Sequence, residues 1–382
     1  MSAARRFIAT TDMTTRTHDV TVLGAGIGGL ACAIACRLRG LSVELIEQAP
    51  ALTEVGAGIQ IAPNGGRVLD ALGVRPRFLN SSAVHLIDGP TGRSVIGMPV
   101  GSGFRMVHRA DLIAALAARA TALDIPVHLN NKIMSVAGEG GTLITKGGET
   151  RLVTRLIGAD GAHGVTRAFV APDHKPTFTG QVAWRAVVPV DNWPREAQVH
   201  MGPGRHLVCY PLRDGRSLNI VAVEERSEWT VASWSQTDDP ENLRQAFAGY
   251  AAPVRDLLAR VEEVHLWGLM DHGVTPNWTR GRCTLIGDAA HPTLPFLAQG
   301  ANLALEGAWT LAQRLDDPER WDKLRRPRVT RALAAAGANA RNYHLSGAKR
   351  RVGHLALRVL DRFAPGLPLL GYRWLYDADV TV

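Results

Sequence analysis

Three carboxylates follow short hydrophobic runs of the kind that form buried strands, and two of them, Asp160 and Asp288, stand beside small residues. Glu47 ends SVELIE, Asp160 stands in LIGADG, and Asp288 stands in TLIGDAAH. A carboxylate at a strand end can accept hydrogen bonds from hydroxyl groups, and neighbouring glycines let a ligand approach the backbone closely. Asp-Gly pairs are also ordinary turn formers, so no single motif is specific. Together the three raise the hypothesis that a ligand sits close to the backbone at these strand ends.

The first carboxylate belongs to a stretch in which strand, turn, helix and strand follow one another. DVTVL (19–23) and SVELIE (42–47) are rich in aliphatic and β-branched residues and predict strands. LACAIACRLRG (30–40) lies between them and predicts a helix that Gly40 closes. This order of elements is the one that a dinucleotide-binding unit requires.

The turn before this helix carries the spacing Gly24-x-Gly26-x-x-Gly29. In a dinucleotide fingerprint the first glycine makes a tight turn, the second lets the backbone approach a pyrophosphate, and the third lets helix and strand pack closely. The helix N-terminus then attracts the phosphates, and Glu47 can accept hydrogen bonds from an adenosine ribose. A purely structural glycine turn is the alternative, and the accompanying strands, helix and acid argue against it.

The residue composition of the chain, and with it the expected secondary structure, changes twice after this strand–helix–strand unit. Residues 106–123 predict a helix, and 127–167 predict short strands joined by glycine-rich turns. Residues 177–274 carry five tryptophans and alternating apolar positions, which predict a mostly antiparallel sheet with a hairpin turn at 214–215. From Asn302 onward the chain is rich in Ala, Leu and Arg and predicts helices.

The charge and the hydropathy of the chain argue against a nucleic-acid-binding protein and against a membrane-spanning one. The formal net charge is +8, with basic runs at Arg325, Arg326, Arg328 and Arg331 and again at 349–351. We interpret these runs as a solvated helix face that would also attract anions. No nucleic-acid-binding module is recognised, and no apolar run approaches the roughly 18 residues of a membrane span, so neither nucleic acid nor a membrane span is expected.

The four cysteines are scattered and predict no disulfide framework, which favours the cytoplasm. Cys32 and Cys36 share one helix face, and we interpret them as core residues because no His or Cys cluster stands near them. No metal site is expected. Residues 1–17 lack the apolar core of a signal peptide and predict a disordered lead, with Met13 as an alternative start.

The motifs GAGIGG, GADG and GDAAHP, in this order and spacing, resemble the three fingerprints of class A flavoprotein monooxygenases. The similarity extends to EVGAGIQIAPNGGRVLDALG (54–73), VHRADL (107–112) and PFLAQGANLALEGA (295–308), and so covers nearly the whole chain. Within this family the chain resembles salicylate hydroxylase-like and 3-hydroxybenzoate 6-hydroxylase-like enzymes. The resemblance implies an α/β chain with a Rossmann-like FAD-binding fold (GR2 type), an interleaved, mostly antiparallel substrate sheet and C-terminal helices.

The resemblance also implies a division of the chain and a set of FAD-binding residues. The FAD-binding domain would comprise 18–85, 104–176 and 275–325, the substrate domain 86–103 and 177–274, and the C-terminal helical segment 326–382. Asp288 would bind a ribityl hydroxyl, Arg109 would contact FAD, and the loop from Pro295 to Asn302 would lie along the isoalloxazine. A surface salt bridge between Arg109 and Asp111 is the alternative for that arginine. The residues expected to hold FAD are Gly24, Gly26, Ile27, Gly28, Gly29, Glu47, Gln48, Gly58, Arg109, Asp160, Gly161, Asp288, Pro295, Gly300, Ala301 and Asn302.

The chain departs from the family pattern at two places. Gly164 stands where the Asp-Gly motif usually continues with serine, which puts the affinity for NAD(P)H in question. In HLVCYP (206–211), Cys209 stands where hydroxylating relatives tend to have a histidine base. His206 and Tyr210 are the neighbouring candidates for this role, and His206 is equally explained by a structural one. For Cys209 we favour a buried, protonated thiol packed against the substrate ring over a catalytic thiolate.

The implied activity is that of a monooxygenase with non-covalently bound FAD and transiently bound NADH or NADPH. It would hydroxylate a small, anionic phenolic or benzoate-type ring with O₂ through a C4a-hydroperoxyflavin, with or without decarboxylation. An epoxidase or oxidase of the same fold, acting on a larger polyketide-like or isoprenoid substrate, is the enzymatic alternative. A FAD-fold binding protein of the GDP-dissociation-inhibitor type is the non-enzymatic one, and the GDAAHP and AQGAN loops argue against it. The expected assembly is a monomer or a homodimer.

Overall fold

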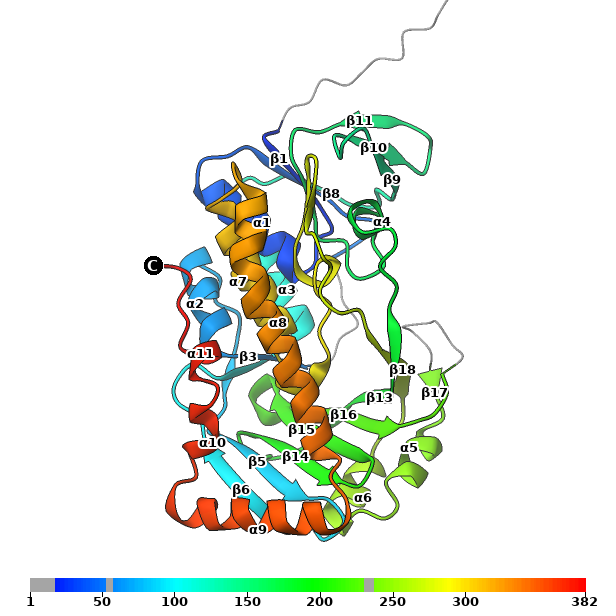
Figure 1. Ribbon diagram of the computed structural model, residues 1–382, viewed down its shortest axis with the longest axis vertical. Helices are drawn as coiled ribbons and strands as arrows, with labels where there is room; N and C mark the ends of the chain where they lie inside the picture. The colour runs from blue at the N-terminus through cyan, green and yellow to red at the C-terminus, as the bar shows by residue number, and fades with distance from the viewer. Residues whose placement is uncertain (1–17, 53–57, 230–236) are drawn as a thin grey trace, which may run out of the picture.

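The computed structural model describes residues 18–52, 58–229 and 237–382, and the expected lead at 1–17 lies outside this part of the chain. Two lobes, one above the other in Figure 1, are joined by the long helix α8 (Pro318–Tyr343). The upper lobe is built on a six-stranded sheet. In order across it, the strands are β19 (Thr279–Arg280), β20 (Cys283–Leu285), β12 (Leu156–Gly158), β1 (Val20–Leu23), β2 (Val43–Ile46) and β8 (Val127–His128).

The central strands of this sheet run parallel, because β1 pairs with β2 and β12, and β12 pairs with β20, all in parallel register. Their carboxyl ends therefore meet at one edge. Glu47, Asp160 and Asp288 follow β2, β12 and β20 and lie at that edge, although they are far apart in sequence. The predicted strand–helix–strand unit is confirmed as β1, α1 (Ile27–Leu38) and β2.

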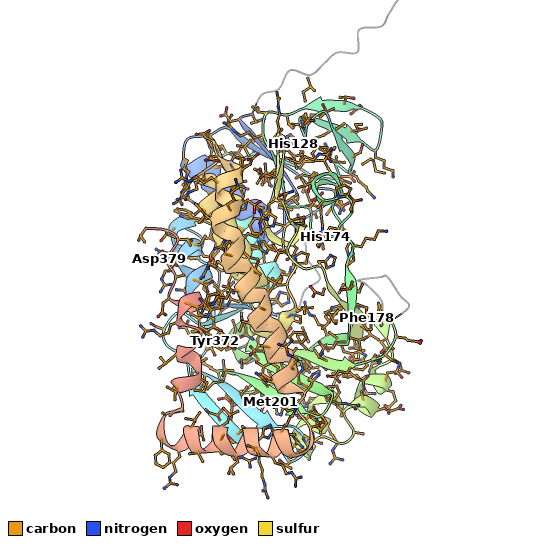
Figure 2. All side chains as sticks on the ribbon, in the orientation of Figure 1. His128, His174, Phe178, Met201, Tyr372 and Asp379 are labelled. Atoms are coloured by element: carbon orange, nitrogen blue, oxygen red, sulfur yellow. The ribbon has the colours of Figure 1, made fainter. Side chains whose placement is uncertain are left out.

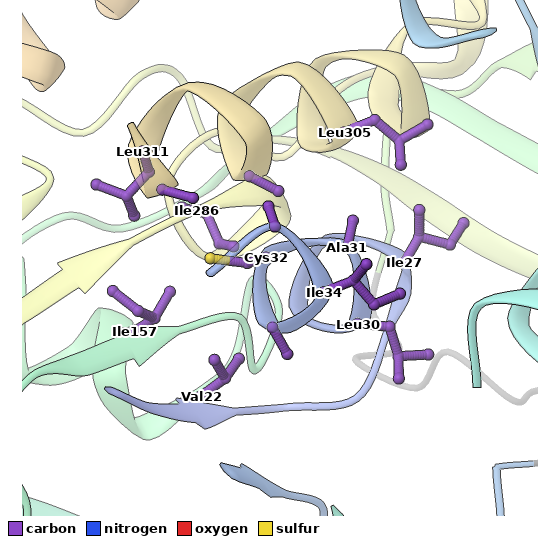
Figure 3. Close-up of a cluster of buried hydrophobic side chains, with 14 of the residues drawn as sticks. Val22, Ile27, Leu30, Ala31, Cys32, Ile34, Ile157, Ile286, Leu305 and Leu311 are labelled. Atoms are coloured by element: carbon purple, nitrogen blue, oxygen red, sulfur yellow. The ribbon is translucent and has the colours of Figure 1, made fainter. Parts of the chain in front are cut away.

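The core of the upper lobe forms where α1 packs against the sheet on one side and α7 (Gly300–Ala312) on the other (Figure 3). Small residues on α1 let the helices approach, since a Cβ added at Gly28 would lie 3.5 Å from the Cβ of Ala304. Cys32 points toward Ile286 in this core, and the four cysteines are all buried and free. Burial of each large aliphatic side chain in such a core contributes about 1.5–3 kcal/mol.

Two small sheets and further helices complete the upper lobe. One sheet contains β11 (Thr150–Leu152), β10 (Thr142–Thr145) and β9 (Ile133–Ala137), and the other contains β3 (Gly58–Ile61), β7 (Arg105–His108) and β4 (Leu79–Asn80). The remaining helices are α2 (Pro63–Leu72), α3 (Arg109–Ala122) and α4 (Val165–Val170), with short 3-10 turns η2 (Gly287–Ala289) and η3 (Pro295–Leu297). His108 caps α3, because its Nδ1 accepts a hydrogen bond from Ala110 N at 3.3 Å.

The lower lobe is an eight-stranded sheet in which every pairing except that of β5 with β14 is antiparallel. In order, the strands are β17 (Thr237–Asp238), β18 (Val264–Asp271), β13 (Thr177–Pro189), β16 (Ser217–Glu225), β15 (Arg205–Leu212), β14 (Glu196–Gly202), β5 (Ala83–Asp88) and β6 (Ser94–Pro99). The 3-10 turn η1 (Arg213–Gly215) joins β15 to β16, as the predicted hairpin required. Helices α5 (Pro240–Ala246) and α6 (Ala252–Leu258) pack on one face.

C-terminal helices cover the left and lower edges of the molecule in Figure 1. Helix α9 (Gly347–Phe363) lies under β6, and α10 (Leu367–Leu370) and α11 (Arg373–Tyr376) return toward α2. Tyr372, labelled in Figure 2, donates its hydroxyl to Asn339 Oδ1 of α8 at 2.8 Å and so ties this return to the long helix. The division that we expected at 325/326 falls inside α8, and that at 85/86 falls inside β5.

The interpretation of the first basic run as a solvated helix face is wrong for Arg325, although Arg331 of the same run is exposed. The side chain of Arg325 is 5% exposed and forms an ion pair with Glu306 of α7. Arg328 adds a second contact to the same carboxylate, with Nη2 2.8 Å from Oε1. Burial alone would raise the pKa of Glu306, but the two guanidinium groups outweigh it and hold the pKa at about 2. The arginines therefore neutralise a buried acid that a helical pattern does not reveal.

No helix in the described part of the chain combines the length and the apolar character that a membrane crossing needs.

Candidate active site

A cavity of about 1490 Å³ lies between the carboxyl edge of the parallel sheet and one face of the eight-stranded sheet. Pockets for single small ligands typically measure roughly 300–1,000 Å³. The cavity therefore has room for a large ligand at the strand ends together with a small one against the sheet. Most of the residues that we expected to hold FAD line it, and the exceptions are Gly29 and Asn302.

The glycine loop leaves its backbone open to this cavity. Gly24 has φ +102° and a Cβ there would overlap the Ala159 carbonyl, while a Cβ at Gly29 would overlap the Gly24 carbonyl. Gly29 thus serves the close packing of α1 on β1, as the fingerprint predicts. Gly26 is different, because a Cβ at this position would meet no protein atom within 4 Å. It is the N-cap of α1 and lines the cavity, so the space in front of this helix N-terminus is kept clear.

Glu47 fixes the glycine loop and still faces the cavity. Its Oε2 accepts a hydrogen bond from Ala25 N at 2.7 Å, and its Oε1 accepts one from Ala49 N at 2.9 Å. A carboxylate has about four acceptor positions, so each oxygen can accept one more bond. Glu47 can therefore hold the loop and bind a ribose hydroxyl at once.

Asp160 caps the short helix α4, which begins after Gly164. Its Oδ2 accepts from Thr166 N at 3.0 Å, and its Oδ1 accepts from the Thr166 hydroxyl. A Cβ at Gly164 would overlap this carboxylate, which gives a physical reason for glycine where the family pattern has serine. Burial raises the pKa of Asp160, and the hydrogen bonds from Thr166 oppose that shift.

Asp288 lies on η2 and lines the cavity, and its side chain is exposed to that open space. Desolvation raises its pKa, and the positive charges of Arg109 and Arg167 lower it. Arg167 is held in turn by a hydrogen bond from Nη1 to Ala289 O at 2.7 Å. Asp111 pairs with Arg213 at 3.3 Å, so the predicted alternative, a salt bridge from Arg109 to Asp111, gains no support. Arg109 instead faces the cavity on the side of Asp288.

The loop from Pro295 to Asn302 follows the cavity wall and ends in α7, which begins at Gly300, two residues before the predicted helical stretch. Ala298 has φ +51°, so the loop turns sharply before the helix. Asn302 faces away from the cavity and anchors the loop. Its Oδ1 accepts from Ala62 N at 2.9 Å, and its Nδ2 donates to Ala298 O at 2.8 Å and to Gln60 O at 3.1 Å. The side chain of Asn302 therefore supports the loop, and the expected contact of its backbone N–H with the flavin stays a prediction.

These features fit FAD. A clear helix N-terminus suits the pyrophosphate, Glu47 suits the adenosine ribose, and Asp288 suits a ribityl hydroxyl. The first N–H groups of α7 lack intrahelical partners and can face the negative charge of a reduced isoalloxazine.

The three catalytic candidates on β15 do not share a face. His206 and Tyr210 line the cavity, whereas Cys209 points to the opposite side of the sheet and packs in the core with Trp184 and Leu218. Side chains alternate along a strand, so residues 206 and 210 must face one way and 209 the other. The candidacy of Cys209 as a base, and its expected contact with the substrate ring, are therefore corrected.

Cys209→Ser is expected to keep wild-type hydroxylation within about threefold, because burial raises the pKa of the thiol and keeps it neutral, away from the cavity. The substitution should lower the stability of the fold instead. A buried hydroxyl needs a hydrogen-bond partner, and Gln198 Oε1 lies 4.0 Å from the position of the sulfur, which is too far for a hydroxyl. Steady-state turnover and thermal unfolding of both proteins measure the two effects. A large loss of turnover with unchanged flavin content would show that the thiol is catalytic.

Arg185 is a cavity residue that no sequence motif indicated. It lies on β13, and its Cζ stacks 4.7 Å from the ring centroid of Trp267 on β18. Its Nε is buried without a hydrogen-bond partner, and among the described residues no carboxylate lies within 4.0 Å of its guanidinium. Desolvation lowers its pKa, with a further lowering from Arg109 and a raising effect from Tyr210. A desolvated cation of this kind stabilises a bound anion.

Comparison with known proteins agrees with this geometry. The chain matches the FAD binding domain family over residues 17–323. It is 32% identical to 3-amino-4-hydroxybenzoate 2-monooxygenase PtnB3 of Streptomyces platensis, over 97% of this chain and 98% of the relative. It is 33% identical to 3-hydroxybenzoate 6-hydroxylase of Polaromonas naphthalenivorans (strain CJ2), over 94% of this chain and 96% of the relative.

The chain belongs to the FAD binding domain family. It is a flavoprotein monooxygenase, and its cofactor is FAD. The fold class that the sequence predicts is confirmed by a solved salicylate hydroxylase in complex with its substrate. That structure superposes with a TM-score of 0.80 over 95% of this chain and 96% of its own, at 23% identity.

Proposed function

We propose that this monooxygenase uses NAD(P)H and O₂ to hydroxylate a small phenolic ring that carries a carboxylate. The observation that carries the proposal is the continuity of the cavity, in which the FAD cradle opens onto a sheet face that presents Arg185, His206 and Tyr210. Bound FAD, once reduced, supplies the activation of O₂ and the oxygen atom that the ring receives. The hydroxybenzoate substrates in the names of both relatives support the same substrate class.

The chain's own residues would bind and orient this substrate. Arg185 would bind the carboxylate, and Trp267 holds the arginine in place from the neighbouring strand. His206 or Tyr210 would receive a hydrogen bond from the phenol. Apolar surface on the wall that excludes water comes from three further residues, which are Phe296, Val208 and Leu269. A half-buried cation without a carboxylate partner among the described residues favours an anionic ring over a neutral isoprenoid substrate.

A screen of hydroxybenzoates and substituted phenols tests the proposal. Substrate-stimulated NAD(P)H oxidation should be accompanied by a product that has gained one oxygen atom from labelled O₂, and CO₂ release would identify a decarboxylating reaction. If every carboxylated phenol only stimulates peroxide formation, or none stimulates NAD(P)H oxidation, the proposed substrate class is wrong.

NADH is the expected electron donor. The described residues at the cavity mouth offer no cluster of arginines arranged around a 2′-phosphate, which NADPH recognition would favour. The ratio of kcat/KM for the two donors, measured at saturating substrate, decides this prediction. A clear preference for NADPH would contradict it.

The assembly and the cellular location are part of the proposal. We expect a monomer or a homodimer. A second copy of the chain could bind the exposed apolar side chains on and after α9, which are Val352, Leu355, Val359, Phe363, Leu367 and Leu370. Light scattering at two protein concentrations distinguishes the monomer from the homodimer. Four free, buried cysteines support a reducing compartment such as the cytoplasm.

A further inference from the structure

Three titratable side chains connect the cavity to the protein surface. His206 lines the cavity, and its Nδ1 lies 2.6 Å from Nε2 of His344. Nδ1 of His344 lies 2.7 Å from Oε1 of Glu225. Exposure rises along this chain, from 1% at His206 to 8% at His344 and 54% for the side chain of Glu225. The three groups therefore span the wall of the substrate lobe from inside to outside.

Distant segments build this connection. His206 lies near the start of β15 and Glu225 at the end of the neighbouring β16, while His344 follows the last turn of α8. The rings of Phe296 and Tyr343 lie 5.5 Å and 5.1 Å from that of His206, so aromatic surface flanks the buried end.

The outer end opens into a second pocket. Glu225 lines a surface depression of about 510 Å³ together with Thr179, Gly180, Gln181, Arg226, Ser227 and Arg341. Water can therefore reach the carboxylate.

The hydrogen bonds fix one direction of donation. The Glu225 carboxylate can only accept, so Nδ1 of His344 is the donor and Nε2 of the neutral ring is an acceptor. Nδ1 of His206 must then donate to that Nε2, which leaves Nε2 of His206 as the acceptor for a ligand in the cavity. Each imidazole is thus set to take a proton on the cavity side and release one on the solvent side.

The surroundings keep both rings neutral near pH 7. Desolvation lowers the pKa of His206 well below its ordinary value, and His344 lowers it further. Desolvation also lowers the pKa of His344; Glu225 opposes this shift and Arg205 adds to it. Gln181 Nε2 lies 3.5 Å from Nδ1 of His344, and Arg205 is held by Glu224 at 3.2 Å. Because the pKa values of both imidazoles are lowered, each ring keeps one nitrogen free to accept a hydrogen bond at neutral pH. Only acidic pH would protonate that nitrogen and interrupt the chain of hydrogen bonds.

We propose that His206, His344 and Glu225 form a proton relay that carries the phenol proton of the substrate from the cavity to solvent. The proposal rests on the phenol hydroxylation proposed above. The substrate O–H bond breaks as Nε2–H forms on His206, and the Nδ1 proton of His206 moves to Nε2 of His344. The Nδ1 proton of His344 moves to Glu225, which releases it to water. A phenolate remains in the cavity, and no electron is transferred to or from the three side chains.

A purely structural contact that fastens the end of α8 to the sheet is the competing explanation. The two explanations differ at Glu225→Gln. The amide oxygen of glutamine still accepts the hydrogen bond from His344, so the fastening survives, but the amide cannot take up the proton. Glu224→Gln is a matched control, because Glu224 lies on the same strand and pairs with Arg205 and Arg226 instead of His344.

The kinetic test uses 3-hydroxybenzoate and salicylate as probes with the FAD-loaded enzyme. Glu225→Gln is expected to lower kcat about 10-fold at unchanged KM and unchanged rate of flavin reduction, because general acid–base steps contribute roughly 10²–10⁴-fold in all. The loss should shrink as pH rises and solvent hydroxide replaces the relay. His344→Ala should lose more and recover with added imidazole. Glu224→Gln should match the wild type, and equal losses in both glutamine variants would refute the relay.

Nitrogen-15 NMR of histidine-labelled protein tests the relay without turnover. Both imidazoles are expected to be neutral and protonated on Nδ1 at pH 7. An Nε2-protonated or positively charged His344 would refute the relay whatever the enzyme's substrate is. If instead the wild type hydroxylates neither probe while the Nδ1 tautomers are found, the proposed substrate class fails and the direction of donation stands.

Discussion

Asp288→Ala protein is expected to purify with little of its yellow flavin. The carboxylate lies inside the cavity, where it faces Arg109 and Arg167 and would accept a ribityl hydroxyl. Hydrogen bonds to charged groups contribute roughly 1.5–3 kcal/mol, so FAD affinity should fall about 10- to 100-fold. The loss also leaves two partly buried guanidinium groups without this anion, which weakens the wall of the site.

Titration of apoprotein with FAD, followed by flavin fluorescence, measures this effect. Asp288→Asn retains the shape and separates the lost charge from the lost volume. Asp256→Ala, on the exposed side of α6, should bind FAD like the wild type. Heat or acid should release intact FAD from the wild type, because the binding is non-covalent. Undiminished flavin in purified Asp288→Ala would contradict the placement of the ribityl chain.

The FAD cradle could be predicted from the sequence because its signals are local. The glycine spacing lies within one turn, and Glu47, Asp160 and Asp288 each lie within three residues of the end of a strand. Parallel strands align their carboxyl ends, so the topology alone brings these three acids to one edge. Gly164 was visible as a departure, but its cause was not. Only the structure shows that the Asp160 carboxylate, which caps α4, fills the space of a side chain at this position.

The substrate wall could not be predicted in the same way, because its partners come from separate strands and helices. Strand alternation alone is enough to separate Cys209 from His206 and Tyr210, since an odd spacing places two side chains on opposite faces. The sequence contains no local pattern that places Arg185 in the cavity, because its stacking on Trp267 depends on the register between β13 and β18. The contact of His206 with His344 depends on where α8 ends, which a helical pattern does not fix to one residue.

Arg185→Met is expected to raise KM for a carboxylated phenol about 100-fold while flavin content stays that of the wild type. Methionine replaces much of the volume of arginine and removes its charge. Losing one partner of a buried, hydrogen-bonded charge pair costs about 2–5 kcal/mol, and about 1.4 kcal/mol corresponds to tenfold. Arg185→Lys should recover part of the affinity, because lysine keeps the charge but cannot bind a carboxylate with two parallel hydrogen bonds.

The origin of this loss can be assigned by changing the substrate as well as the protein. The methyl ester of the same phenol lacks the negative charge, so the wild type should bind it weakly and Arg185→Met should bind it no more weakly. Arg280→Met is the control for the loss of a stacked arginine, because Arg280 stacks on Phe169 at the same 4.7 Å and does not line the cavity. If Arg185→Met weakens the acid and its ester equally, the arginine shapes the pocket through Trp267, and the substrate carboxylate must bind elsewhere.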